Sequence, residues 1–272
     1  MTASAPGRPG DFYSTRYSPE RQKLRDMLFA EVYENYFGQS SWVSTADYDR
    51  FVDWLELTSS SRVLDIACGA GQPVLRLASA TGCSVVGIDS SEHAIANATT
   101  LAQERGLSAR AQFECQDAGQ PLAFDDHSFD ALMCVDALSH LPNHPKVFAE
   151  WARVLKHRGQ LIFTDQVLTG PISNVEVGAR TPHGHFLFVL DGYDERQLNN
   201  AGFELLRRVD LTLSFVSIAA RHCAVRARHS EALRAAEGDQ EFELQKRYRA
   251  TAEVLAREGR LSHFAYVARK AA

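Results

Sequence analysis

The residues best suited to bind a ligand follow two short apolar runs of the kind found in buried strands. The first run, 62–67, contains Asp65 and leads into Ala67-Cys68-Gly69-Ala70-Gly71-Gln72. The glycines let the backbone approach a ligand closely, and the Asp65 carboxylate can accept hydrogen bonds from an ammonium group. The second run, 84–88, ends at Asp89 and Ser90, where a carboxylate can accept both hydroxyls of a ribose. The two runs predict a site for a ligand that carries an ammonium group and a sugar.

Polar residues also follow two further expected strands. The strand 111–115 precedes Gln116-Asp117-Ala118, where a carboxylate and a backbone N–H could read an adenine edge, and the strand 129–135 precedes Asp136. In an open parallel sheet, ligands bind outside the carboxyl ends of the strands, near the point where strand order reverses. The expected ligand contacts are therefore Asp65, Ala67, Gly69, Gly71, Gln72, Asp89, Ser90, Asp117, Ala118 and Asp136.

One histidine is placed to act as a base beside this ligand. His140 comes four residues after Asp136, just past a strand end, and an imidazole titrates close to neutral pH. Asp165, which ends a fifth expected strand at 159–164, could orient or assist it. A lone histidine in a loop is more often a solvated or structural residue, so the prediction depends on the neighbouring strand ends.

The elements that position these residues alternate between strand and helix. Helical patterns at 74–80, 91–105 and 145–155 separate the expected strands, which indicates a parallel sheet with helices on both faces. Two helical patterns precede the sheet, at 19–37 and around 48–55. After the fifth strand come a Pro- and Gly-containing loop, a helix at 195–201, a strand at 204–209, a long helical stretch and a last strand at 263–267.

This order divides the chain into an arm, a cap and one large domain. We expect a flexible arm at 1–18, cap helices at 19–57 and a single domain at 58–272 with a cap insertion at 166–190. The stretch Arg221–Arg249 mixes basic and acidic residues and is interpreted as an ordinary solvated helix face.

Composition excludes several classes of protein. The 272 residues carry a net charge of −5, which argues against a nucleic-acid binder, and no apolar run approaches the about 20 residues that cross a bilayer. The N-terminal residues lack the apolar core of a secretory signal. The five cysteines are odd in number and form no C-x-x-C pair, which favours a reducing compartment, and we predict a cytoplasmic protein. The oligomeric state stays open.

The strand-end residues together resemble the pattern of class I S-adenosylmethionine-dependent methyltransferases. The matching segments are Val63-Leu64-Asp65-Ile66-Ala67-Cys68-Gly69-Ala70-Gly71, Val86-Gly87-Ile88-Asp89, Gln116-Asp117-Ala118 and the loop 154–161 before the fifth strand. Val74 stands where a dinucleotide-binding fold would have its third glycine, so that fold is the weaker interpretation. The resemblance implies a Rossmann-like, seven-stranded, mostly parallel sheet and S-adenosyl-L-methionine as cofactor.

Two groups of small-molecule methyltransferases extend the resemblance to the catalytic residues. O-methyltransferases of sugars and natural products have a histidine followed by Leu/Met-Pro and an aspartate after strand 5, as in His140-Leu141-Pro142 and Asp165. Phosphoethanolamine methyltransferases are similar at Tyr33-Glu34-Asn35-Tyr36-Phe37-Gly38 and at Val43-Ser44-Thr45. The second resemblance implies a latch between Tyr33 and His140, with Ser44 at the cofactor.

The sequence departs from the phosphoethanolamine enzymes in its expected substrate site. Gln166 stands where that family has a tyrosine. Phosphate recognition needs convergent Arg, Lys or Tyr side chains, and the sequence shows no convincing cluster of them. We therefore do not predict a phosphorylated substrate.

The leading hypothesis is a methyltransferase acting on an N or O atom of a small molecule, with His140 as base or orienter beside Tyr33 and Asp165. The alternatives are a non-catalytic cofactor-binding module and a C-methyltransferase of a natural product. A protein or RNA substrate is disfavoured by the expected cap and by the acidic balance. No metal is expected, because His183 and His185 have no Cys or acidic partner in their loop; that loop is interpreted as solvated, with a substrate contact as the alternative.

Overall fold

The structure is a computed structural model that describes residues 17, 19–182 and 186–271. Nearly all of the expected arm, 1–18, lies outside the described residues, and so do His183 and His185. No helix among the described residues is long and apolar enough to cross a membrane.

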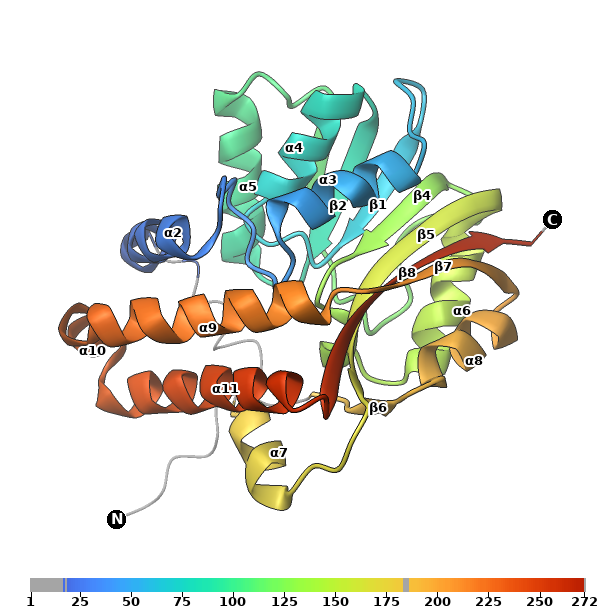
Figure 1. Cartoon of the computed structure of the whole chain (residues 1–272). Helices are drawn as coiled ribbons and strands as arrows, with labels where there is room; N and C mark the ends of the chain where they lie inside the picture. The colour runs from blue at the N-terminus through green and yellow to red at the C-terminus, as the bar shows by residue number, and fades with distance from the viewer. Residues whose placement is uncertain (1–16, 18, 183–185, 272) are drawn as a thin grey trace, which may run out of the picture.

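The centre of the molecule is a mixed sheet in the order β3-β2-β1-β4-β5-β8-β7, with β6 paired to β5 (Figure 1). Strands β1 to β5 pair in parallel, and β8 runs antiparallel between β5 and β7. The mostly parallel sheet expected from the sequence is confirmed, and the two-residue β6 is an addition. The strands are β1 Arg62–Ile66, β2 Ser84–Asp89, β3 Ala111–Cys115, β4 Phe129–Cys134, β5 Leu155–Leu168, β6 Val189–Leu190, β7 Phe203–Asp210 and β8 Leu261–Lys270.

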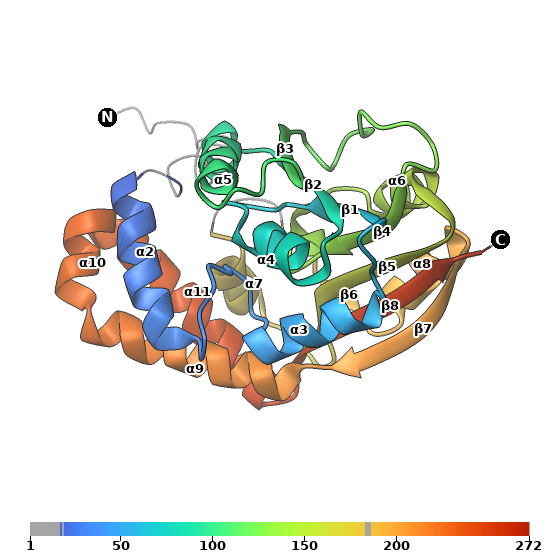
Figure 2. The same cartoon turned by 90° about the horizontal axis from the view of Figure 1, so that it is seen from above.

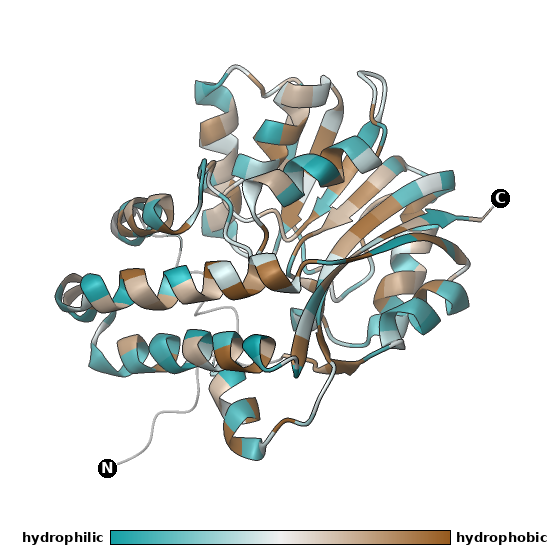
Figure 3. Cartoon of the chain, in the orientation of Figure 1, coloured by the Kyte–Doolittle hydropathy of each residue, from teal (hydrophilic) through white to brown (hydrophobic). Residues whose placement is uncertain are grey.

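Helices cover both faces of the sheet because its strands are apolar on both sides. In β1, Val63 packs in one hydrophobic core, and Leu64 and Ile66 pack in the core on the other face. The first face is covered by α3 Thr45–Trp54, α4 Gln72–Thr81 and α5 Glu92–Glu104, and the second by α6 His144–Val154 and α8 Tyr193–Asn200 (Figure 2). Figure 3 shows the hydrophobic residues concentrated in the strands.

A third hydrophobic core lies outside the sheet and holds a helical cap together. It joins Phe29 of α2 to Phe215 and Ile218 of α9 and to Leu255 of α11. In Figure 1, α9 and α11 lie side by side and antiparallel, with α10 joining them and α7 beneath α11. The cap helices are α2 Pro19–Val32, α7 Asn174–Arg180, α9 Thr212–Arg228, α10 Ser230–Glu237 and α11 Asp239–Arg257.

The cap differs from the sequence expectation in two respects. The long helical stretch consists of three helices that extend away from the sheet, and the 166–190 insertion contains α7. The interpretation of Arg221–Arg249 as a solvated face is wrong for its inner side, because His222, Arg226 and Arg249 are buried. Because these buried residues have polar or charged side chains, the hydrophobic pattern of the sequence does not indicate that this side of the helices is buried.

The first helix ends earlier than the pattern 19–37 predicts. Helix α2 stops at Val32, and the chain then takes positive φ angles at Asn35 and Gly38. A Cβ at Gly38 would lie 2.3 Å from the Gln72 side chain, so this turn needs a glycine. The early stop frees residues 33–43 to run back toward the sheet as a loop.

We predict that Phe163→Ala destabilises the protein by about 3–5 kcal/mol. Phe163 is fully buried in β5, and its ring lies 4.8 Å from the ring of Tyr266 and 5.4 Å from that of Phe148. Urea unfolding followed by circular dichroism measures the loss. The control Leu213→Ala, at a residue 88% exposed, should change stability by less than about 0.5 kcal/mol. Equal losses in the two variants would contradict the assigned core.

Candidate functional site

A cavity of about 740 Å³ lies at the carboxyl ends of β1, β2 and β4, beneath the helical cap. Its walls come from the strand ends, from the loop 38–42 and from α2, α7, α9 and α11. The sheet order reverses between β1 and β4, so the cavity occupies the position at which ligands bind in open parallel sheets.

The loop after β1 presents a buried carboxylate to this cavity. Asp65 is 6% exposed and lines the cavity, and its carboxylate has no hydrogen-bond partner among the described residues. Burial, and then the neighbouring charge of Asp89, raise the pKa of Asp65 to about 8. Ala67 and Gly69, with φ of 58° and 57°, bend the backbone around the site. A buried carboxylate without a partner fits a cationic group of a ligand.

The end of β2 supplies a second carboxylate that is already held in place. Asp89 accepts hydrogen bonds from the backbone N–H of Gly69 at 3.0 Å and of Ser91 at 2.9 Å. Burial raises the pKa of Asp89, whereas these two N–H donors lower it. Each carboxylate oxygen keeps a lone pair for a ligand hydroxyl. Ser90 also lines the cavity, as predicted.

The end of β3 forms the rim of the same site. Gln116, Asp117 and Ala118 all line the cavity. The Asp117 carboxylate is exposed and accepts a hydrogen bond from Gly119 N at 2.8 Å, which fixes the turn. Residues at the ends of β1, β2 and β3 therefore line one cavity.

Three predicted contacts support the cavity without lining it. Gly71 caps the start of α4, where a Cβ would meet Ala98 at 2.7 Å, and Gln72 is the first residue of that helix. Ser44 caps α3, where its hydroxyl accepts a hydrogen bond from Asp47 N. Gly71, Gln72 and Ser44 are not among the lining residues, so direct contact of these three with the cofactor stays a prediction.

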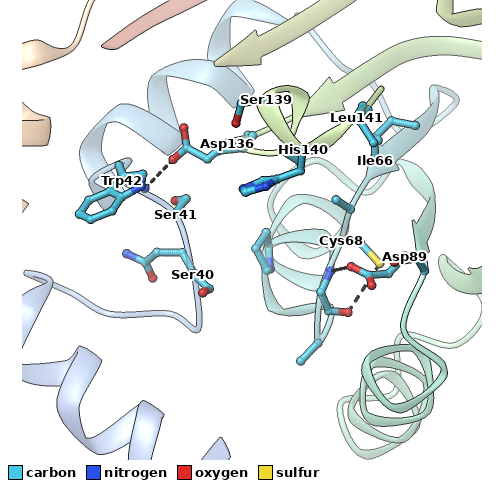
Figure 4. Close-up of a pocket in the computed structure, with 18 of the residues that line it drawn as sticks. Ser40, Ser41, Trp42, Ile66, Cys68, Asp89, Asp136, Ser139, His140 and Leu141 are labelled. Carbon is cyan, nitrogen blue, oxygen red and sulfur yellow. Dashed lines mark hydrogen bonds between the residues drawn. The ribbon is translucent and has the colours of Figure 1, made fainter. Parts of the chain in front are cut away.

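Asp136 lines the cavity, but its carboxylate already has protein partners. It accepts a hydrogen bond from Trp42 N (Figure 4). It also accepts hydrogen bonds from Thr164 Oγ1 at 2.8 Å and from His263 Nε2 at 2.7 Å. Burial raises the pKa of Asp136, but the charge of His263 and these donors outweigh it and lower the pKa. Asp136 therefore positions the loop 38–42 as well as bordering the ligand.

His140 lies in the middle of the cavity wall. It ends a short 3-10 turn, Leu138–His140, which its backbone N–H closes on Ala137 O. In Figure 4 its ring lies between the Asp136–Trp42 pair and the end that holds Cys68 and Asp89. The imidazole ring is 5.3 Å from the ring of Phe186, edge to face. The predicted base is thus next to the predicted cofactor site.

The other two predicted catalytic residues have different surroundings from those expected. Asp165 is buried but does not line the cavity; desolvation and then the charge of Asp194 raise its pKa. This placement does not support an assisting role at His140. Tyr33 does line the cavity, where its hydroxyl donates to Ser41 O and lies 3.2 Å from His222 Nε2.

Several cavity residues come from the cap and were missed by sequence reasoning. Except for Trp42, which lies in the loop 38–42, they are on separate helices whose inward faces are partly polar, so no local motif marks them. The missed lining residues include Trp42, Arg180, His222, Gln245, Tyr248 and Arg249. Among the described residues, no group of three His, Cys, Asp or Glu side chains is arranged to hold a metal ion.

The cavity offers chemically distinct ends. One end has an unpartnered carboxylate and a second carboxylate suited to paired hydroxyls, and a titratable imidazole stands beside them. The other end is formed by aromatic and basic residues of the cap. This arrangement can hold a cationic nucleoside and bring a second molecule against it.

The sequence is similar to a known protein family over the parallel strands and to individual methyltransferases over a longer stretch. A family model described as a methyltransferase domain matches residues 64–163. The 27-O-demethylrifamycin SV methyltransferase of Amycolatopsis mediterranei (strain S699) is 32% identical over 190 residues, covering 66% of this chain and 70% of that enzyme. The sterol 24-C-methyltransferase erg6 of Aspergillus fumigatus is 32% identical over 157 residues, covering 55% of this chain and 41% of that enzyme.

A solved structure resembles the full length of the chain. The [4+2]-cyclase SpnF matches with a TM-score of 0.75 and 26% sequence identity, over 99% of this chain and 98% of its own. By contrast, the chain spans between 41% and 70% of the length of eight curated relatives in sequence. The structural similarity therefore extends along the whole chain, whereas the sequence similarity covers only part of each relative's length.

We predict that the affinity for S-adenosylhomocysteine rises with pH between pH 6 and 8. With a pKa of about 8, Asp65 is mostly protonated at pH 6 in the free protein, and the ligand's ammonium group binds the ionised form. Below that pKa the affinity should rise by up to about tenfold per pH unit, with release of a proton. Calorimetry at three pH values measures both effects.

The variant Asp65→Asn should remove this pH dependence and lower the affinity by about 1.5–3 kcal/mol, the range for a hydrogen bond to a charged group. The exposed Asp53 on α3 provides the matched control Asp53→Asn, which should behave as wild type. The assignment of Asp65 is wrong if the affinity of Asp65→Asn is unchanged.

Proposed function

Because the chain belongs to the class I S-adenosylmethionine-dependent methyltransferases, we propose that it transfers the methyl group of this cofactor to an oxygen or nitrogen of a small molecule. The observation that carries the proposal is the placement of His140 beside the cavity end that holds Asp65 and Asp89.

The residues at the strand ends fit the parts of the cofactor. Asp65 would accept hydrogen bonds from the ammonium group of its methionine part, and Asp89 would accept them from the two ribose hydroxyls. Asp117 and Ala118 would border the adenine. When bound, the cofactor supplies an electrophilic methyl group on a sulfonium.

The protein's part in the reaction is alignment and proton removal. The acceptor's lone pair forms the new bond to the methyl carbon as the carbon–sulfur bond breaks, so the two molecules must be held in line. A hydroxyl acceptor also loses its proton, and His140 is the titratable side chain of the cavity wall placed to receive it. The cap helices over the cavity would limit the access of water.

The cavity supports a small acceptor. Its walls come from the sheet and from four cap helices, and its volume is about 740 Å³, which the cofactor and the acceptor would share. One relative is named for methyl transfer to an oxygen of a rifamycin and another for methyl transfer to carbon 24 of a sterol. Carbon methylation of a natural product is therefore the alternative acceptor chemistry.

A second candidate function is cofactor binding without methyl transfer. The likeness to the [4+2]-cyclase SpnF extends over 99% of the chain, which supports a different reaction on the same fold. Methyl-labelled cofactor, supplied with a panel of phenols, alcohols and amines, separates the two candidates. Label in the acceptor supports the methyltransferase, whereas cofactor binding without labelled product from any acceptor supports the second candidate.

We predict that His140→Ala lowers turnover by about 100- to 10,000-fold on a hydroxyl acceptor, the usual range for loss of a general base. Its affinity for S-adenosylhomocysteine should stay near that of wild type, because Asp65 and Asp89 remain in place. Steady-state kinetics and calorimetry measure the two quantities on the same protein.

The control His93→Ala removes an exposed histidine on α5 and should leave both quantities unchanged. A mild loss in His140→Ala would favour an amine acceptor that binds already neutral. Full activity would show that His140 is not the base.

A further inference from the structure

The cap end of the cavity is lined by basic side chains, whereas the carboxylates of the lining come from the sheet end. These carboxylates lie in a strand or just after one: Asp65, Asp89, Asp117 and Asp136. Arg180, at the end of α7, and Arg249, in α11, line the cavity from the cap. We propose that the acceptor carries an anionic oxygen group, a carboxylate or a phosphate, held beside Arg180; this inference rests on the proposed methyl transfer.

Arg180 is the residue on which the inference depends. It is 1% exposed, and no carboxylate among the described residues lies within ion-pair distance of it. Its Nη2 donates to Gln166 Oε1 and its Nη1 donates to Tyr248 O at 3.3 Å, and both acceptors are neutral. Its Nε has no hydrogen-bond partner among the described residues.

A buried guanidinium in this state needs a counter-charge. Arginine stays protonated in proteins, so Arg180 cannot relieve the cost of burial by losing its proton. Removing such a cation from water costs several kcal/mol unless an anion compensates for it. Because Arg180 lines the cavity and no described carboxylate pairs with it, a bound ligand could supply that anion.

Aromatic rings connect this charge to the predicted base. The Arg180 Cζ lies 5.2 Å from the ring centre of Phe186 and 4.1 Å from that of Tyr248. The Phe186 ring in turn lies 5.3 Å from that of His140, and the Arg249 Cζ lies 5.9 Å from the Tyr248 ring. An acceptor atom at His140 and an anionic group at Arg180 would thus both lie close to Phe186.

The positions of His140, Phe186 and Arg180 indicate which chemical groups the acceptor carries. It has a hydroxyl or amine at one end, an apolar body that packs on Phe186, and a carboxylate or phosphate at the other end. The competing explanation is that Arg180 only braces α7 against β5 and α11 through Gln166 and Tyr248. A brace would affect stability without giving any preference for anions.

Calorimetry on the full chain saturated with S-adenosylhomocysteine distinguishes these explanations. One arm compares 4-hydroxyphenylacetate with its neutral amide, and the other compares phenyl phosphate with its neutral dimethyl ester. We expect one anion to bind at least about tenfold more tightly than its neutral partner, and added salt to reduce the difference. The arm with the larger preference identifies carboxylate or phosphate as the group recognised.

The variant Arg180→Met keeps the apolar stem and should abolish the preference, whereas Arg180→Lys keeps the charge and should retain part of it. The control Arg257→Gln changes an arginine on the exposed side of α11 and should keep the full preference. The inference is overturned if neither anion is preferred by the wild type. It is also overturned if Arg180→Met or, should that variant not fold, Arg180→Lys shows an undiminished preference.

The outcome is separable from that of the proposed function. Anion preference is measured with the demethylated cofactor, so it requires no methyl transfer. If anions are preferred but no labelled product forms, the anion site is supported and the methyl transfer is rejected. If labelled product forms without any preference for anions, the methyl transfer is supported and the anion site is rejected.

Discussion

The buried carboxylate of Asp136 joins the parts of the structure that form the cavity. It connects the end of β4 to Thr164 in β5, to His263 in β8 and to the loop that contains Trp42. His263 is fully buried, so its hydrogen bond to Asp136 is shielded from water. Removing a donor from a buried charged group leaves that group unsatisfied, which typically costs at least about 1–3 kcal/mol. The positive φ of Asp136, 54°, also redirects the chain after β4 and brings His140 to the cavity.

The cavity near Asp136 contains two buried charged groups of opposite sign that lack a counter-charge among the described residues. Among the residues that the structure describes, the buried Asp65 carboxylate has no hydrogen-bond partner, and the buried Arg180 guanidinium has only neutral partners. Each would weaken a protein built for stability alone, and such exceptions to the rules of burial are characteristic of functional sites. A cationic cofactor would supply the counter-charge for Asp65, and an anionic acceptor would supply it for Arg180. The two opposite charges would then direct each ligand to its own end of the cavity.

The sequence predicts the sheet and the carboxylates at its strand ends well, for a physical reason. Buried parallel strands are short apolar runs, and a carboxylate such as Asp65 or Asp89 at the end of one is conspicuous. The cap is poorly predicted because its inner surface includes Arg180, His222 and Arg249, residue types that usually face solvent. Contacts between distant segments, such as that of Tyr33 with His222, depend on how helices dock and leave no mark in local spacing.

The position of β8 has a consequence for how the chain acquires its fold during synthesis. This strand follows every other described element, yet it lies inside the sheet between β5 and β7. Until it emerges from the ribosome, β5 and β7 each keep an unpaired edge, and Asp136 lacks His263. Exposed edges of this kind promote aggregation. The nascent chain therefore exposes these edges until β8 is added, however stable the finished domain is.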